Sequence, residues 1–185
     1  VRRAGLLQSK TALFRAPSRR PNISYHIVRV PSTDQDPGAD AVRIAAVDRI
    51  KRWLASLSAA DGAAARAMVF CTTISEVEAL GTDLTGHGVA HHTFHGKMAR
   101  DEKLAKWKAF VSASAAAKVL VCTKAAGLGV DYATVGLALS VGWVSSLTQF
   151  VQNSGRAGRD GRPCRAELIW SNAAKKRFHQ SFVAA

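Results

Sequence analysis

Two arginines lie three residues apart in a glycine-rich stretch, residues 152–161 (QNSGRAGRDG), at the end of an expected helix. Glycines remove side-chain bulk and allow unusual backbone angles, so the chain can pass close to a bound group. Two guanidiniums from one turn can then reach the same phosphate oxygens through paired hydrogen bonds. Arg156 and Arg159 are therefore candidates for binding a phosphoryl group. Glycine and arginine content alone, however, favours an ordinary basic loop after a helix.

A second candidate turn, residues 123–131 (TKAAGLGVD), directly follows an expected strand. A hydroxyl at the end of a strand and a glycine-flanked turn could present backbone N–H groups to a phosphate. Taken alone, this pattern favours an ordinary turn between a strand and a helix.

The elements that position these two loops alternate between strands and helices. Runs of β-branched, aromatic and continuous apolar residues predict strands over residues 23–30, 67–71, 89–94, 118–122, 135–141 and 165–170. Helical spacing of apolar residues predicts helices over residues 41–57, 73–86, 99–111 and 146–153, with a basic helical tail from residue 173. This alternation predicts an α/β fold with a mostly parallel central sheet and helices on both faces. In such sheets ligands bind in loops at the carboxyl ends of strands, which suits both glycine-rich loops.

Two of these helices carry further local predictions. The start of the second helix has two possible capping boxes, Thr73 with Glu76 and Ser75 with Glu78. The helix over residues 99–111 is expected to bury three apolar side chains, Leu104, Trp107 and Phe110.

Composition limits the classes of protein and partner. The 185 residues are enough for one domain with a full core. The net charge of +13 favours an anionic partner such as nucleic acid or nucleotide, although a basic proteome or a surface adapted for solubility explains it equally well. Three separated cysteines with no C-x-x-C pair predict buried free thiols at Cys71 and Cys122, no metal site, and a reducing intracellular compartment. No apolar run approaches membrane-spanning length, so no membrane partner is expected.

The stretch Q-x-x-G-R-A-G-R-D-G at residues 152–161 resembles the sixth motif of superfamily-two helicases, and its ending is most similar to the RecQ family. The turn at residues 123–131 matches T-x-A-x-G-x-G-V-D, the pattern of the fifth motif. R-P-N-I-S-Y at residues 20–25 resembles the joint that opens the second RecA-like domain of RecQ helicases. Residues 69–72 are similar to the fourth motif, and residues 94–98 resemble the family's Y-H-A-G-L turn. The motifs follow one another in the family's order.

The resemblance covers about residues 14–170 and implies a RecA-like three-layer sandwich, the second motor domain of a RecQ-like DNA helicase. It places this domain at residues 23–172, after a linker or the end of a first motor domain at residues 1–22 and before a basic tail at residues 173–185. The sequence begins without Met and contains neither G-x-x-x-x-G-K-[S/T] nor D-E-x-H. We therefore expect the first motor domain to lie outside this sequence.

In such motors ATP with Mg²⁺ binds between two RecA-like domains, and the first domain supplies the phosphate loop and the magnesium-binding acid. The resemblance implies that Arg156 and Arg159 act on the triphosphate like arginine fingers, with Gln152 coupling it to the motif. The cofactor-lining positions that it implies are Gly127, Gly129, Asp131 and Gly155. The nucleic-acid contacts that it implies are Thr123, Lys124 and His95, and His95 fits a hydrogen-bonded turn histidine equally well.

The implied function is that of the C-terminal motor domain of an ATP-dependent 3′–5′ DNA helicase. Its implied partners are single-stranded or partly unwound DNA and the first motor domain, and the implied location is intracellular, in the nucleus of a eukaryote. One alternative is a non-catalytic nucleic-acid-binding module that keeps the fold and the charge. Another is an RNA helicase motor domain, against which the A-G-R-D-G ending and the R-P-N joint argue. Lys124 replaces a small or apolar residue of the family pattern and Asn153 replaces an acidic one. An active enzyme, a truncated gene product and a decayed copy therefore all stay open.

Overall fold

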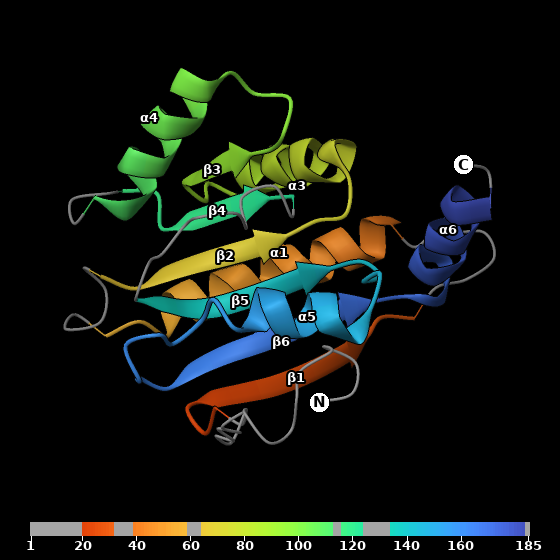
Figure 1. The fold of residues 1–185 in the computed structure, drawn as a ribbon, viewed down its shortest axis with the longest axis horizontal. Helices are drawn as coiled ribbons and strands as arrows, with labels where there is room; N and C mark the ends of the chain where they lie inside the picture. Colours follow the sequence, from red (N-terminus) through yellow and green to blue (C-terminus); the bar gives the residue numbers. More distant parts are fainter. Residues whose placement is uncertain (1–19, 32–38, 59–63, 113–115, 124–133, 184–185) are drawn as a thin grey trace, which may run out of the picture.

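The computed structural model describes residues 20–31, 39–58, 64–112, 116–123 and 134–183. Its described strands form one six-stranded sheet in the order β1-β6-β5-β2-β4-β3, and every pairing between them is parallel (Figure 1). The strands are β1 (Ile23–Arg29), β2 (Arg66–Phe70), β3 (His91–Phe94), β4 (Val119–Cys122), β5 (Val135–Val141) and β6 (Cys164–Trp170). The predicted α/β fold with a largely parallel sheet is confirmed.

Helices cover both faces of this sheet. They are α1 (Ala39–Ala55), α3 (Ile74–Gly86), α4 (Arg100–Val111), α5 (Leu147–Ser154) and α6 (Asn172–Val183). Side chains of α1 and α3 share one buried cluster, and Phe110 of α4 and Ala157 after α5 belong to a second cluster. Figure 1 shows α5 in front of the sheet and α1 behind it. The predicted three-layer sandwich is therefore confirmed.

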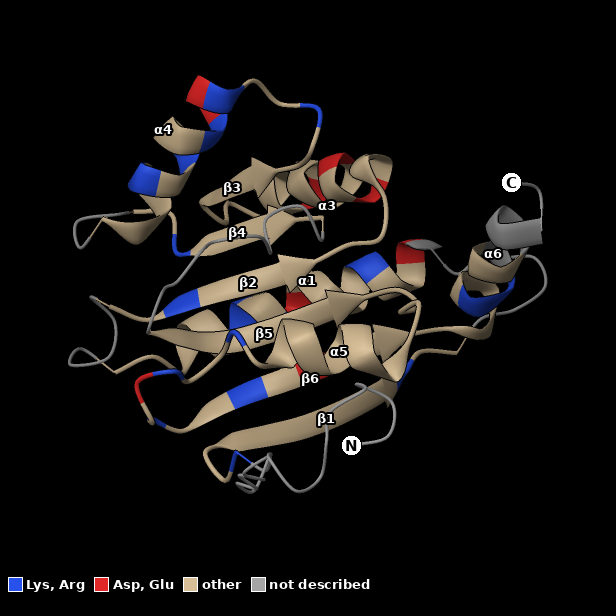
Figure 2. Ribbon diagram, viewed as in Figure 1, with Lys and Arg blue, Asp and Glu red and all other residues tan. Residues whose placement is uncertain are grey.

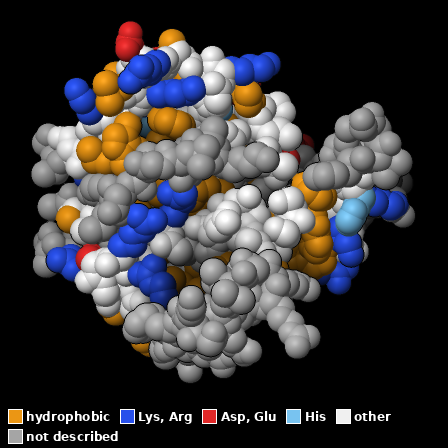
Figure 3. Space-filling model, viewed as in Figure 1, with side chains coloured by type: hydrophobic (Ala, Val, Ile, Leu, Met, Phe, Trp, Pro, Cys, Tyr) orange, Lys and Arg blue, Asp and Glu red, His pale blue; other side chains and the backbone are white. Residues whose placement is uncertain are grey.

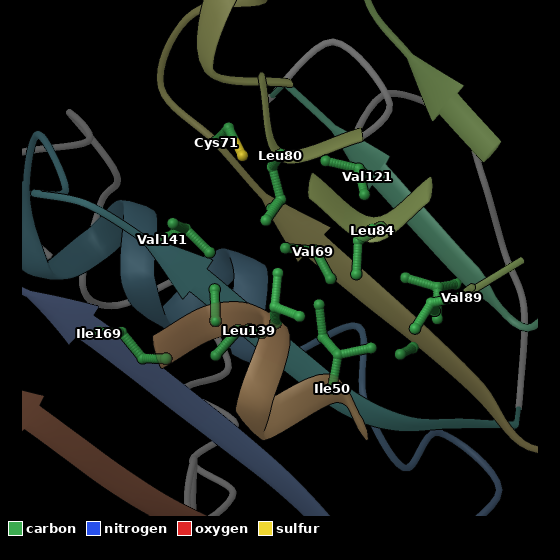
Figure 4. Close-up of a cluster of buried hydrophobic side chains, with 14 of the residues drawn as sticks. Ile50, Val69, Cys71, Leu80, Leu84, Val89, Val121, Leu139, Val141 and Ile169 are labelled. Carbon is green, nitrogen blue, oxygen red and sulfur yellow. The ribbon is translucent and has the colours of Figure 1, made fainter. Parts of the chain in front are cut away.

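The central strands are buried on both faces, as their continuous apolar runs predict. In β2, Ala67 and Val69 contribute to the first cluster, whereas Met68 and Phe70 contribute to the second. This follows from the alternation of side chains along a strand. Figure 4 shows the first cluster, in which Ile50 of α1 lies near side chains from the strands and from α3.

The start of α3 uses the first of the two capping boxes. The Thr73 hydroxyl accepts a hydrogen bond from the Glu76 backbone N–H at 3.2 Å, and the Thr73 N–H donates to the Glu76 carboxylate at 3.0 Å. These two hydrogen bonds give partners to backbone N–H groups at the start of the helix, which have no acceptor within the helix. The alternative capping box, Ser75 with Glu78, does not form the cap, because both residues lie inside the helix.

The prediction that Leu104 of α4 is buried is wrong. Leu104 is 51% exposed, whereas Phe110 is fully buried and Trp107 is partly buried. Phe110 follows Leu104 by six positions, which at 3.6 residues per turn is one full turn plus about 240°. The two side chains therefore leave the helix about 120° apart, and only the Phe110 side lies against the sheet.

The tail predicted from residue 173 is helical, since α6 begins at Asn172. The Lys175 ammonium lies 5.2 Å from the centre of the Trp143 ring, and this ring meets Trp170 edge-on at a centroid distance of 5.0 Å. Cation–π and edge-to-face contacts thus connect α6 to the ends of β5 and β6. No helix in the described residues has the length and apolar character needed to span a membrane.

Arg66 opens β2 and is fully buried. Its guanidinium donates to the Phe110 carbonyl at 2.7 Å and to the Ser112 carbonyl at 2.5 Å, both at the end of α4. The last carbonyls of a helix lack partners within that helix, so a buried arginine fork can supply their donors. Arg66 thus connects α4 to the first residue of a central strand.

We expect Arg66→Met to lower the free energy of unfolding of this chain by about 2–3 kcal/mol, because buried carbonyls lose their donor while most of the side-chain volume is kept. Denaturant unfolding checks this. The matched control is Arg52→Met on α1, where the side chain is 70% exposed and pairs with Asp48. We expect the control to change stability by less than about 0.5 kcal/mol. Equal losses in the two variants would contradict the anchoring role.

Candidate nucleotide and nucleic-acid site

The arginine-bearing loop follows α5. This helix begins after Ser146, whose hydroxyl accepts from the Gln149 backbone N–H at 3.1 Å, and Gly155 caps its other end. Gly155 itself has a helical φ of −64°, whereas Gly158 and Gly161 have φ values of +58° and +81°. A left-handed backbone favours glycine. The sharp turn therefore depends on the second and third glycines of the stretch rather than on the first.

The structure places Arg156 and Arg159 close together on this loop. Burial, and then the charge of Arg159, lower the pKa of the Arg156 guanidinium from its ordinary value. Arg156 is partly buried and Arg159 is exposed. Two neighbouring cations on one turn are suited to an anion with several oxygens, such as a terminal phosphoryl group. The two arginines therefore fit the triphosphate that the family resemblance implies.

Arg156 also lies near the carboxyl end of β4. Burial raises the pKa of the Cys122 thiol to about 12, although the positive charge of Arg156 acts in the opposite direction. Cys122 is therefore a neutral core thiol at ordinary pH and not a nucleophile. Since Thr123 follows Cys122 directly, the structure brings the arginine loop near Thr123, the first residue of the predicted fifth-motif turn.

Three neighbouring strands, β2, β4 and β3, have their carboxyl ends next to one another. The Thr123 N–H donates to the Phe94 carbonyl at 3.2 Å, and the Cys71 N–H donates to the Cys122 carbonyl at 2.8 Å. Residues that follow β2, β3 and β4 therefore lie side by side, as expected for the ends of parallel strands. Thr123 is only 7% exposed, and its contact with nucleic acid stays a prediction.

His95 follows β3 and its side chain is 15% exposed. Its Nε2 lies 4.0 Å from the Glu78 carboxylate, and its Nδ1 is buried with no hydrogen-bond partner in the part of the chain that the structure describes. The alternative of a hydrogen-bonded turn histidine predicts a partner for this nitrogen, and the described residues do not supply one. Its role at nucleic acid stays a prediction.

The remaining predicted residues divide into two groups. Gln152 is exposed in the last turn of α5, and Arg156 follows the Gly155 cap of that helix. Four predicted residues lie outside the described residues: Lys124, Gly127, Gly129 and Asp131.

Basic side chains extend beyond the loop. Figure 2 shows Lys and Arg residues on α4 and on the loop between α5 and β6. In the space-filling view, such side chains gather on α4 and across the middle of the same face (Figure 3). This distribution agrees with the charge-based prediction of an anionic partner.

Sequence reasoning missed two residues that contact the arginine loop from the other end of the chain. Arg20 donates to the Gly155 carbonyl at 3.0 Å and also to the Gly158 carbonyl. The Asn22 amide donates to the Gly158 carbonyl at 2.7 Å and to the Arg162 carbonyl at 3.0 Å. The only sequence signal for them is their place in the R-P-N joint, because periodicity carries no information about partners this far apart in sequence.

The parallel sheet, the two helical layers and the paired arginines define a RecA-like α/β domain. The chain belongs to the family described as the helicase conserved C-terminal domain, whose model matches residues 47–161, more than half of the sequence. The predicted resemblance to the second motor domain of superfamily-two helicases is thereby confirmed.

The relatives that the chain is similar to include proteins named as DNA helicases of the Q type, in line with the predicted resemblance. The chain is similar to ATP-dependent DNA helicase Q1 of Mus musculus, with 27% identity over 167 residues that cover 89% of this chain and 23% of that protein. It is similar to ATP-dependent DNA helicase Q5 of Rattus norvegicus, with 31% identity over 104 residues that cover 56% of this chain and 10% of that protein. The chain thus spans less than a quarter of the length of these relatives.

A solved structure confirms the fold. Domain 2 of the DEAD-box helicase Mss116p, described as bound to an RNA duplex, superimposes with a TM-score of 0.64. The match has 21% identity and covers 82% of this chain and 55% of that chain. At this identity the likeness shows the RecA-like fold alone.

Proposed function

We propose that this chain is the second motor domain of a RecQ-like, ATP-dependent 3′–5′ DNA helicase. The observation that carries the proposal is the pair Arg156 and Arg159, which one glycine-dependent turn holds close enough for their charges to interact. The family supports the motor assignment, and the relatives named as DNA helicases support the substrate class.

In this proposal, ATP with Mg²⁺ lies between this domain and a first RecA-like domain and supplies the phosphoryl group for transfer to water. Arg156 and Arg159 stabilise the negative charge on the transferring group. Gln152, in the last turn of α5, orients this end of the helix toward the phosphate. Opening and closing of the two domains with each turnover moves the strand.

Nucleic acid in this proposal runs along the ends of β2, β3 and β4, with Thr123 and His95 at the phosphate backbone. The net charge of +13 supports binding that is mostly electrostatic. The A-G-R-D-G ending and the R-P-N joint favour DNA over RNA. The RNA duplex belongs to the structure of Mss116p and enters this proposal only as a competitor to test.

The test compares this chain alone with the full-length protein that joins it to a phosphate-loop domain. We expect single-stranded DNA to stimulate ATP hydrolysis by the full-length protein, whereas the chain alone hydrolyses no ATP because half of the site is absent. We expect the chain's affinity for oligo(dT) to fall about tenfold to twentyfold between about 50 and 200 mM salt, as for about three phosphate contacts.

Three results would contradict the proposal. A full-length protein that binds DNA but never hydrolyses ATP indicates the non-catalytic binding module. Stimulation by single-stranded RNA and not by DNA of the same length and composition indicates an RNA motor. Turnover by the chain alone would show that the catalytic residues do not lie between two domains.

A further inference from the structure

Arg20 and Asn22 each hold two carbonyls of the arginine loop. The acceptors of Arg20 belong to Gly155 and Gly158, which lie on either side of Arg156. The acceptors of Asn22 belong to Gly158 and Arg162, which lie on either side of Arg159. Each of the two residues therefore brackets one of the two arginines.

The contacts also reach the Arg159 side chain. The Gly155 carbonyl that accepts from Arg20 at 3.0 Å also accepts from the Arg159 Nε at 3.4 Å. The Arg20 guanidinium is a planar fork, so its two bonds fix the distance and direction between the Gly155 and Gly158 carbonyls. A change at Arg20 is thus transmitted to the backbone on both sides of Arg156 and to the acceptor of Arg159.

The position of Asn22 is fixed by the sheet. Its carbonyl accepts from the Cys164 N–H at 2.9 Å, next to the first paired residues of β1 and β6. The Arg20 carbonyl accepts from the Ile23 N–H at 3.1 Å, so residues 20–23 form a tight turn around Pro21. This turn connects the start of β1 rigidly to the arginine loop.

We propose that Arg20 and Asn22 are positioning residues for phosphoryl transfer, and that they orient Arg156 and Arg159 through the backbone of the loop. Residues 20–22 directly precede β1, so a displacement of this turn acts on the arginine pair without passing through the core. We call Arg20 and Asn22 the clamp. The inference rests on the proposed function, because it assigns the clamp an effect on the same reaction.

The test uses Arg20→Lys and Asn22→Ala in the full-length protein. Lysine keeps the positive charge but has no fork, and alanine removes both amide donors while leaving the backbone bond to Cys164. Arg52→Lys, an exposed arginine on α1, is the matched control. We expect kcat to fall roughly tenfold to a hundredfold in the two clamp variants, because misplacement of a catalytic group by about 1 Å has this effect. We expect the control to be unchanged.

Two further measurements, the KM for ATP and the binding of nucleotide analogues, distinguish a positioning role from a purely structural contact. We expect the KM for ATP to change less than about threefold, because the lost interaction is made in the transition state. We expect weaker binding of ADP with aluminium fluoride, a transition-state mimic, and unchanged binding of a non-hydrolysable ATP analogue. In an Arg156→Ala Arg159→Ala background, Arg20→Lys is expected to have no further effect on binding of the mimic.

The outcomes separate this inference from the proposed function. If Arg159→Ala abolishes turnover while both clamp variants keep the wild-type kcat, the clamp is wrong and the motor assignment stands. If the clamp variants lower Tm but keep kcat and mimic binding below that Tm, the contacts are structural only and the inference is again overturned. If Arg156→Ala and Arg159→Ala leave turnover intact, the proposed function itself fails.

Discussion

Arg159→Ala in the full-length protein is expected to lower kcat for DNA-stimulated ATP hydrolysis by about a thousandfold, and Arg156→Ala by a similar factor. The reason is electrostatic: a guanidinium aimed at the transferring phosphoryl group stabilises charge that develops only in the transition state. Because this interaction is weak in the ground state, the KM for ATP is expected to change little. Steady-state kinetics at saturating single-stranded DNA measures both constants.

The lysine variants sharpen this prediction. Arg159→Lys keeps a positive charge but cannot form two parallel hydrogen bonds to phosphate oxygens, so we expect a kcat between those of the wild type and Arg159→Ala. DNA binding, measured separately, is expected to be unchanged in all of these variants. Arg52→Ala, on the far side of the sheet, is the control for loss of one positive charge. A similar fall in kcat for the control and for Arg159→Ala would show that overall charge, and not position, matters.

Local pattern was sufficient for most of the fold. The apolar run that ends at Cys71 predicts a strand buried on both faces, and β2 is such a strand. The period of side chains in a strand or helix is set by backbone geometry, so it can be seen in the sequence. The same local information failed for Leu104, because helical spacing indicates an apolar stripe but not which part of it meets another element.

Side-chain contacts between residues far apart in the sequence were not predictable in this way. Arg66 at the start of β2 is fully buried because the end of α4 supplies its acceptors, 44 and 46 residues further along the chain. The Arg20 contacts with the loop span 135 and 138 residues. Such partners are decided by the three-dimensional arrangement of the strands, and a single sequence contains no periodic signal for them. The motif resemblance located both ends of the clamp without indicating that they touch.

Glycine positions show the same limit. The sequence has three glycines in the arginine loop, and their number alone does not say which of them the turn requires. The structure separates them by φ and by the space around each Cα. Gly155 adopts a helical conformation, whereas the two that follow have positive φ. Of these two, Gly158 is enclosed by atoms of the described residues and Gly161 is not.

Gly158→Ala is therefore expected to lower the free energy of unfolding by roughly 3 kcal/mol or more, and to lower kcat in the full-length protein as well. An alanine at φ +58° pays the left-handed backbone cost of about 1–2 kcal/mol. In addition, its Cβ would overlap the Asn22 amide nitrogen, lie 2.5 Å from the Cys164 sulfur and lie 3.0 Å from the Arg162 carbonyl oxygen. The loop therefore has to move, and this movement disturbs the hydrogen bond between the Asn22 amide and the Gly158 carbonyl.

Gly161→Ala is the matched control, because Gly161 has φ +81° but no atom of the described residues within 4 Å of an added Cβ. It carries only the backbone cost, so we expect a loss of about 1–2 kcal/mol and a kcat close to that of the wild type. Denaturant unfolding of the chain and ATP hydrolysis by the full-length protein measure the two effects independently. Equal destabilisation of both variants would mean that the packing around Gly158 adds nothing to its backbone requirement. A Gly158→Ala protein with wild-type kcat would mean that the arginine pair tolerates displacement of the loop, because the overlap with Asn22 and Cys164 cannot be relieved without moving that backbone.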